Sequence, residues 1–177
     1  MTISLAIDTA TSRTTVGIIE DGAVLFEKFH EGATDHGRAL SELVAEALKT
    51  SSPPDVVVVG MGPGPFTGLR VGISFAHTFA LARNIPVVGV CSLDAILVKK
   101  SEYTVAIDAR RKEIYWARYK DNVRIDGPHV SKPAEVSGYI IDQYPSALRL
   151  VALSERQNIS EPMYFRRPDA IPTAERT

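Results

Sequence analysis

The chain has 177 residues, and 20 lysines and arginines against 21 aspartates and glutamates give a formal net charge of −1. With 45% apolar and 23% charged residues, the composition is that of a folded globular protein, which excludes a disordered chain and a polybasic nucleic-acid arm. The single cysteine, Cys91, excludes an internal disulfide framework and a cysteine-based zinc site.

The first half of the sequence predicts the element order β-β-β-α-β-α-β. Strands are expected at 3–7, 14–20 and 23–29, with an Asp-Gly hairpin signal at 21–22. An amphipathic helix follows, which Thr34 or Asp35 can cap and whose apolar side chains are Leu40, Leu43, Val44, Ala47 and Leu48. A continuous apolar run at 56–59 predicts a strand buried on both faces of a parallel sheet, and a helix at 66–84 and a strand at 87–90 complete a βαβ unit.

The second half repeats this order in shorter form. It predicts strands at 104–108 and 113–119 joined by a turn, a helix near 134–143 and a strand near 148–153. We therefore expect two related lobes, 1–100 and 101–166, followed by a flexible tail at 167–177 that contains Pro168 and Pro172.

The densest functional signal is the segment 60–70, rich in glycine and proline, between a predicted strand and a predicted helix. Backbone N–H groups at the start of a helix suit a phosphate or a carboxylate. The segment is neither a Walker A loop nor a dinucleotide fingerprint, and Pro63 and Pro65 remove two N–H donors. A structural tight turn and an anion site are both open interpretations.

Two other turns carry polar side chains. The turn after Asp8 sets a carboxylate beside hydroxyl groups, which suits a metal and a phosphate, or an aspartate that caps its own turn. The turn at 108–113 gathers Arg110, Arg111 and Lys112, which suits an anionic ligand, RNA or simply solvent. The candidate nucleotide or anion contacts from all three segments are Asp8, Thr9, Thr11, Gly62, Gly64, Thr67, Gly68 and Arg110.

The sequence predicts no catalytic constellation and no metal site. It holds no His-x-x-x-His pair and no Gly-x-Ser-x-Gly nucleophile motif, and Cys91 follows an apolar strand, where it packs as a small hydrophobe.

The helix predicted at 66–84 is apolar over an arc of about 200°, twice what one buried face requires. Its sheet can cover one half of that arc. The other half is then covered by the rest of the chain or docks another protein, and the docking half is predicted to be Leu69, Ile73, Ala76 and Ala80 rather than Val71, Phe75, Phe79 and Ala82. Gly72 costs about 1 kcal/mol inside a helix, which predicts that another backbone packs close to it.

Four segments resemble, in order along the chain, the signatures of the TsaB (YeaZ) family of bacterial tRNA threonylcarbamoyladenosine biosynthesis. They are residues 7–11, residues 62–70, residues 108–110 with 113–115, and residues 162–166. His36, ahead of the first helix, also matches the family. Pro65 stands where the family usually has serine, and the stretch 123–150 matches least.

The resemblance implies an α/β fold of the actin/Hsp70-like (ASKHA) class, with two small lobes that each hold a mixed sheet flanked by helices. It implies a non-catalytic subunit that docks and activates the catalytic paralogue TsaD, works with the ATPase TsaE, and meets tRNA only through the complex. The first two helices would make the contact, so the predicted interface residues are His36, Leu40, Leu43, Ala47, Leu69, Arg70, Ile73, Ala76, His77 and Ala80.

The resemblance also sets expectations for cofactors and assembly. No cofactor is expected on the chain alone, and ATP or ADP is expected at the subunit interface. The free chain is expected to form a homodimer through the same face. With no signal-like N-terminus and no apolar run near the roughly 20 residues that span a bilayer, we expect a cytoplasmic protein without membrane contact.

An ATP-dependent phosphotransferase of the same fold is the alternative, with Asp8 and the loop 62–68 around ATP. The first turn lacks a glycine, the loop carries two prolines and the second lobe is small, all of which count against it. A metalloprotease is a third interpretation, and the missing histidine pair makes it the weakest.

Overall fold

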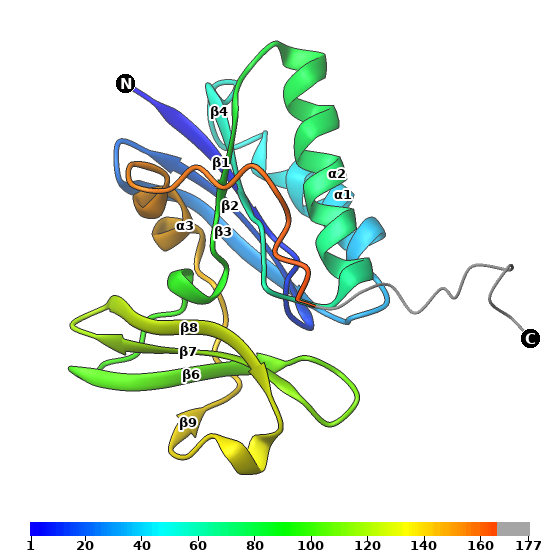
Figure 1. Cartoon of the computed structure of the whole chain (residues 1–177). Coiled ribbons are helices and arrows are strands. Elements are labelled where there is room, and N and C mark those ends of the chain that lie inside the picture. Colours follow the sequence, from blue (N-terminus) through cyan, green and yellow to red (C-terminus); the bar gives the residue numbers. More distant parts are fainter. Residues whose placement is uncertain (166–177) are drawn as a thin grey trace, which may run out of the picture.

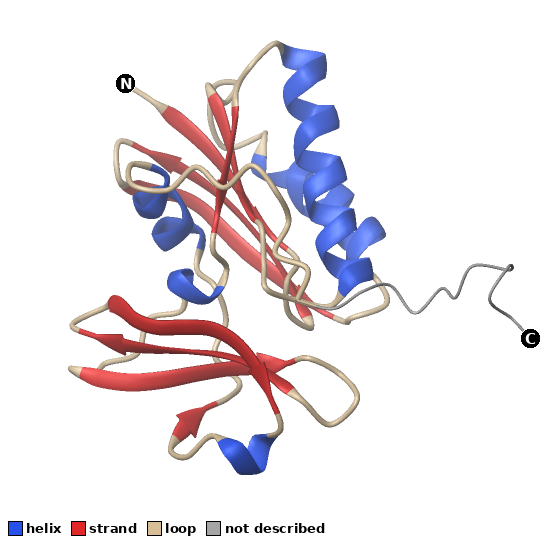
Figure 2. Ribbon diagram, viewed as in Figure 1, coloured by secondary structure: helices blue, strands red, loops and turns tan. Residues whose placement is uncertain are grey.

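The computed structural model describes residues 1–165, and these residues form two lobes, each built on a mixed β-sheet (Figures 1 and 2). The first sheet has five strands in the order β3-β2-β1-β4-β5, and the second has four in the order β8-β7-β6-β9. The strands of the first sheet are β1 (Ile3–Asp8), β2 (Arg13–Glu20), β3 (Ala23–Glu31), β4 (Val56–Gly60) and β5 (Val87–Val90).

The first sheet confirms the predicted meander and the predicted βαβ unit. Strands β1, β2 and β3 are antiparallel neighbours, and β4 pairs parallel with both β1 and β5. Helices α1 (His36–Ala47) and α2 (Phe66–Arg83) cover one face of this sheet, and α3 (Ala147–Ser154) covers the other (Figure 1).

Strand β4 shows why its sequence is apolar at every position. Val57 and Val59 belong to the core between the sheet and helices α1 and α2, whereas Val58 belongs to the core beneath α3. Successive side chains of a strand point to opposite faces, so a strand covered on both sides needs no polar alternation.

The second lobe is a smaller sheet of β6 (Glu102–Asp108), β7 (Ile114–Lys120), β8 (Val123–Ser131) and β9 (Tyr139–Ile140). The predicted hairpin of β6 and β7 is confirmed, and β9 runs parallel to β6. One face of the sheet packs, through Tyr103 and Tyr119 among others, on the turn η1 (Leu93–Ala95), which lies on the connection between the lobes.

Two expectations for the second half are wrong, and one strand was missed. The segment predicted as a helix at 134–143 is the short turn η2 (Pro133–Glu135) followed by β9, and β8 was not predicted at all. The segment predicted as a strand at 148–153 is helix α3, which begins where the Ser146 hydroxyl accepts a hydrogen bond from the Arg149 N–H at 3.2 Å.

Helix α3 also changes the lobe boundary. It packs on the five-stranded sheet, with Ala147 and Leu150 in the core beneath it, so the chain returns to the first lobe after β9 instead of staying in the second lobe to 166. Residue 166 and the predicted tail at 167–177 lie outside the described residues.

Candidate functional site

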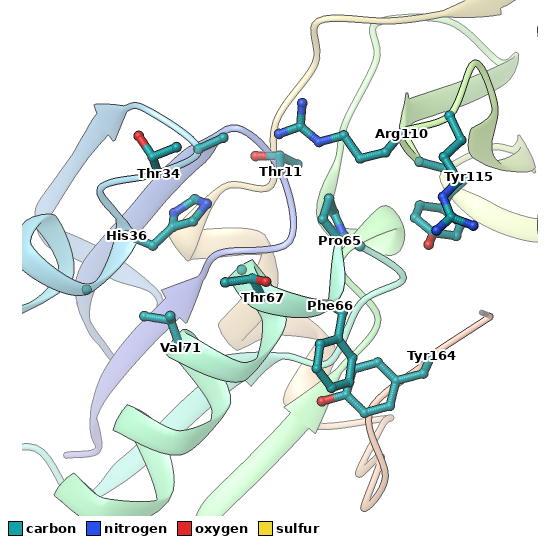
Figure 3. A pocket seen from close by; sticks show the side chains of 16 residues that line it. Thr11, Thr34, His36, Pro65, Phe66, Thr67, Val71, Arg110, Tyr115 and Tyr164 are labelled. Carbon is teal, nitrogen blue, oxygen red and sulfur yellow. The ribbon is translucent and has the colours of Figure 1, made fainter. Parts of the chain in front are cut away.

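A cleft of about 750 Å³ opens between the two lobes (Figure 3). On the side of the first lobe it is lined by the β1–β2 turn and by the first residues of α1 and α2. On the side of the second lobe it is lined by the β6–β7 turn with Arg110 and Arg111, and by Tyr115. The cleft therefore brings together the three segments that the sequence singled out.

The lining of the cleft is electropositive. Helices α1 and α2 both begin there, neither has a side-chain N-cap, and neither has an acidic residue in its first turn. The first N–H groups of a helix have no partner within it and form the positive end of its dipole. None of the 16 lining residues is acidic, although two acids stand next to lining residues in the chain: Asp35, the N-cap residue of α1, and Asp108, which lies 3.5 Å from an Arg110 nitrogen. This arrangement suits an anion.

His36 lies on the floor of the cleft as a neutral, buried side chain. Its Nδ1 lies 2.8 Å from the Thr14 hydroxyl, and only 4% of its surface is exposed. Burial, and then the nearby His30 and Arg110, lower the pKa of His36 below its ordinary value. The positive charge of the cleft at neutral pH therefore comes from the arginines and the helix ends.

Asp8 does not reach the cleft. Its Oδ2 accepts a hydrogen bond from the Ser92 hydroxyl at 2.6 Å, and its Oδ1 accepts one from the Ala10 N–H at 2.9 Å. Burial raises the pKa of Asp8 to about 6. Gly60 lies directly beneath, where any Cβ would overlap Oδ2. This carboxylate caps its own turn and braces β1 against the chain after β5.

The glycine loop packs inside the first lobe. The Gly62 N–H donates to the Ser92 hydroxyl at 3.2 Å, and a Cβ on Gly64 would lie 2.5 Å from the Ala10 carbonyl oxygen. These contacts support the tight-turn interpretation for residues 60–64. Of the candidate anion contacts, Thr11, Gly64, Thr67, Gly68 and Arg110 line the cleft, whereas Asp8, Thr9 and Gly62 do not.

The predicted docking half of α2 is wrong. Its four side chains lie in the core between α2 and the sheet, and the small residues at 72, 76 and 80 mark that buried side: Leu69, Ile73, Ala76 and Ala80 are at most 9% exposed. The close approach predicted at Gly72 exists, but the group that approaches is Thr9 of the same chain.

The other predicted interface residues divide by exposure. His36, Leu40 and Ala47 are buried, Leu43 is half-buried, and Arg70 and His77 are exposed. The outer side of α2 holds an apolar side chain that sequence reasoning missed: Leu81 is 84% exposed. Leu81 lies beyond the stripe that the apolar periodicity selects, so no pattern in the sequence marks it.

An aromatic wall at the mouth of the cleft was also missed. Tyr164 lies against Phe66 at the start of α2 (Figure 3), with ring centroids 4.9 Å apart, and Phe165 lies 6.1 Å from Tyr115 of β7. The last described residues thus connect both lobes. The signal in the sequence was the apolar and aromatic segment 162–165.

Residues 1–165 contain neither a candidate metal site nor a candidate membrane-spanning helix. No group of three or more histidine, cysteine, aspartate or glutamate side chains is placed to hold a metal ion. No helix in this part of the chain has the length and apolar character to cross a membrane.

Comparison with known proteins gives matches over most of the chain. A family model described as "TsaD: tRNA N6-adenosine threonylcarbamoyltransferase" matches residues 30–170. An uncharacterized protein of Mycobacterium tuberculosis is 41% identical over 96% of this chain and 94% of its own length. The Escherichia coli "tRNA threonylcarbamoyladenosine biosynthesis protein TsaB" is 36% identical over 66% of this chain.

The lengths of the relatives differ. The match spans 54% of the Escherichia coli protein and 57% of an uncharacterized Mycobacterium leprae protein that is 42% identical. The chain therefore spans little more than half the length of these two relatives.

Two solved structures share the fold. One is described as YeaZ from Pseudomonas aeruginosa, with a TM-score of 0.71 over 88% of this chain and 91% of that one. The other, described as similar to peptidase YEAZ, has a TM-score of 0.79 over 94% of this chain and all of that one. Both are 22% identical and show the fold alone, which is the predicted ASKHA class. Together with the sequence matches, this places the chain in the TsaB (YeaZ) family.

Proposed function

We propose that this chain is a non-catalytic subunit in the biosynthesis of tRNA threonylcarbamoyladenosine, which docks on and activates TsaD and works with TsaE. The names of the Escherichia coli relative and of the matching family model support the pathway. The observation that carries the non-catalytic role is the position of Asp8. A phosphotransferase of this fold needs that carboxylate at its nucleotide, whereas here both oxygens are engaged inside the first lobe.

The proposed docking face is the outer side of α2 together with the edge along which α2 packs on α1. It consists of Leu81, fully outside, and of Val71, Phe75 and Leu43, which are half-buried at the edge of the core. Exposed polar residues of α2, Arg70 and His77 among them, lie on the same side of the helix as Leu81. Protein interfaces combine apolar and polar contact residues in this way.

Titration calorimetry of the full chain with TsaD of the same organism tests this face. Leu81→Glu is expected to weaken binding at least about tenfold, or about 1.4 kcal/mol, because it replaces a large apolar contact side chain by a charge that binding would bury. Val123→Glu is the matched control, since Val123 is 62% exposed on β8 in the other lobe. Equal affinities for the two variants, both with unchanged melting temperatures, would refute the docking face.

A second role is the binding of an anionic ligand, such as the phosphates of ATP or ADP, in the cleft beside this face. The acid-free lining and the two uncapped helix starts favour it. ADP titrated into the chain alone, TsaD alone and their mixture locates the site. Arg110→Ala is expected to weaken ADP binding where this cleft contributes, and Lys112→Ala, on the same turn but outside the lining, is expected to leave it unchanged.

An ATP turnover assay on the same purified chain tests the phosphotransferase alternative. If it turns over ATP and Asp8→Asn abolishes that turnover, the alternative replaces the non-catalytic role. We expect no turnover, with tRNA reached only through the complex.

A further inference from the structure

The chain crosses between the lobes twice, after β5 and after β9, and a charged side chain clamps each crossing. The first crossing contains η1 with Asp94, and the second contains Tyr144, which Arg13 holds. Neither clamp belongs to the cleft lining or to the docking face.

Asp94 is a buried carboxylate that joins three separate parts of the chain. Its Oδ1 accepts a hydrogen bond from the Tyr119 hydroxyl of β7 at 2.9 Å and lies 3.6 Å from an Arg124 nitrogen of β8. Its Oδ2 accepts one from Gln157 Nε2, after α3, at 2.6 Å. Asp94 itself is only 6% exposed. The second lobe and the returning chain of the first lobe therefore meet on one side chain.

A second layer of hydrogen bonds fixes this cluster. Gln157 Oε1 accepts from the Cys91 N–H at 2.8 Å, which sets the orientation of its amide. Arg149 of α3 donates to the Asp94 carbonyl oxygen at 3.3 Å and to the Asn122 carbonyl oxygen, in the β7–β8 turn, at 3.1 Å. Arg149 thus connects a helix of the first lobe to a turn of the second.

Arg13 clamps the second crossing. Its guanidinium lies between two aromatic rings, 3.8 Å from the centre of Phe29 on β3 and 3.7 Å from the centre of Tyr144. Its Nε also donates to Glu31 Oε1 at 2.9 Å. A planar guanidinium can stack on both rings, which an ammonium group cannot do.

We propose that Asp94 and Arg13 form an inter-lobe lock, which holds the two lobes as one rigid body and sets the opening of the cleft. Any rotation of one lobe separates Asp94 either from Tyr119 and Arg124 of the second lobe or from Gln157 after α3, so the buried carboxylate loses part of its partners. A buried charge that is only partly satisfied is strongly disfavoured. The same rotation pulls Tyr144 off the guanidinium, so the two clamps release together.

Distance measurements between spin labels on the two lobes of the full chain test the lock. The labels are attached at Ser74→Cys on α2 and Ser137→Cys in the second lobe, both exposed positions. Cys91 is fully buried, and a chain without the added cysteines checks that it takes no label.

The lock variants are Asp94→Asn and Arg13→Lys. In Asp94→Asn, the negative charge that faces Arg124 is lost, and one of the two oxygens that accept from Tyr119 and Gln157 becomes an NH2 group. In Arg13→Lys, the charge stays and the stacking is lost.

Matched controls are Asp126→Asn, at a half-buried carboxylate of β8 whose Oδ1 lies 2.8 Å from His129 Nε2, and Arg38→Lys, at an exposed arginine of α1. We expect one narrow distance distribution in the reference chain and in both controls. We expect a broader distribution with added longer distances in each lock variant, broadest when the two are combined.

A purely structural role gives a different result. If the lock variants melt at lower temperature but keep the narrow reference distribution, Asp94 and Arg13 stabilise the fold without holding the lobes, and the proposal is overturned. Should Asp94→Asn fail to fold, Gln157→Leu removes one donor from the same cluster. An unchanged distribution in both Gln157→Leu and Arg13→Lys overturns the proposal equally.

Discussion

The hydroxyl of Thr9 occupies the space that a Cβ on Gly72 would fill, and the same hydroxyl donates a hydrogen bond to the Gly68 carbonyl oxygen at 2.7 Å. The first hairpin turn therefore lies directly on helix α2. The glycine that weakens this helix serves the chain's own packing, so it carries no information about a partner.

Gly72→Ala is expected to destabilise the chain. The added methyl group overlaps Thr9, and overpacking of this kind costs about 1–3 kcal/mol, which exceeds the gain of about 1 kcal/mol in helix propensity. Urea unfolding followed by circular dichroism measures the change. Gly37→Ala on α1 is the control, since a Cβ there meets nothing within 4 Å and is expected to leave stability equal or higher. A Gly72→Ala chain as stable as the reference would contradict the packing described for Thr9.

Asp8 is expected to make stability depend on pH. Burial raises the pKa of its carboxyl from 3.8 to about 6, so the folded chain holds the proton more tightly than the unfolded chain does. This contribution is fully present below pH 3.8 and is lost as the pH rises from 3.8 to about 6. Asp8→Asn, which cannot ionise, is expected to raise stability at pH 7 by up to about 3 kcal/mol, at 1.36 kcal/mol per pKa unit.

Urea unfolding of both chains between pH 4 and pH 8 measures this difference. The free energies of unfolding should converge toward low pH and separate toward neutral pH. Asp126→Asn is the control, because His129 lowers the pKa of Asp126 below 3.8, so its contribution to stability stays nearly constant between pH 4 and pH 8 and is lost only at lower pH. A constant difference between Asp8→Asn and the reference chain across this range would contradict the assignment.

Gly89→Ala is expected to detach the segment after α3. A Cβ on Gly89 would overlap the Ile159 carbonyl oxygen and lie 2.6 Å from Met61 Cγ, at the point where the Ile159 N–H donates to the Gly89 carbonyl at 2.8 Å. Hydrogen exchange followed by mass spectrometry should show faster exchange in residues 157–165, with β1 and β2 unchanged. Unaltered exchange at 157–165 would show that this segment does not pack on β5 as described.

The free chain is expected to self-associate through the docking face, because Leu81 is 84% exposed on the helix that also carries the half-buried Val71 and Phe75. Light scattering at high micromolar concentration should give a mass above that of the monomer, and Leu81→Glu should restore the monomer. Val123→Glu should not. A monomeric mass for the reference chain would contradict the expected self-association. The contact with TsaD is tested separately by calorimetry.

The first lobe was largely predictable because its elements have strong local signals. Residues 56–59 are apolar without interruption, which only a strand covered on both faces requires, and Asp21-Gly22 marks the turn between β2 and β3. Helix α2 ends as predicted at Asn84, whose left-handed conformation closes it.

The second lobe was less predictable because its signals are short or mixed. Strand β8 contains Gly127 and Pro128, residues that usually interrupt a strand. In α3, leucines at 148, 150 and 153 fit a strand as well as a helix over so few residues, and only the cap at Ser146 separates the two.

The candidate site shows a further limit of sequence reasoning. The helix starts and the Arg110 turn were identified, but nothing in the sequence indicates that they face one another across a cleft. For α2, an apolar arc of about 200° does not reveal which half meets the sheet. The small residues Gly72, Ala76 and Ala80 marked the buried half, and they were assigned to a partner instead.

Because the chain returns to the first lobe through α3, the second lobe is an insertion between β5 and α3 of the first lobe. Strand β5 and helix α3 belong to the same packed body, and everything between them leaves and re-enters at neighbouring points that Asp94 and Arg13 hold. Residues can be inserted or deleted in this second lobe without disturbing the five-stranded sheet or the outer side of α2. Length change during evolution, and module exchange in the laboratory, therefore have a natural place in this architecture: between the two clamps.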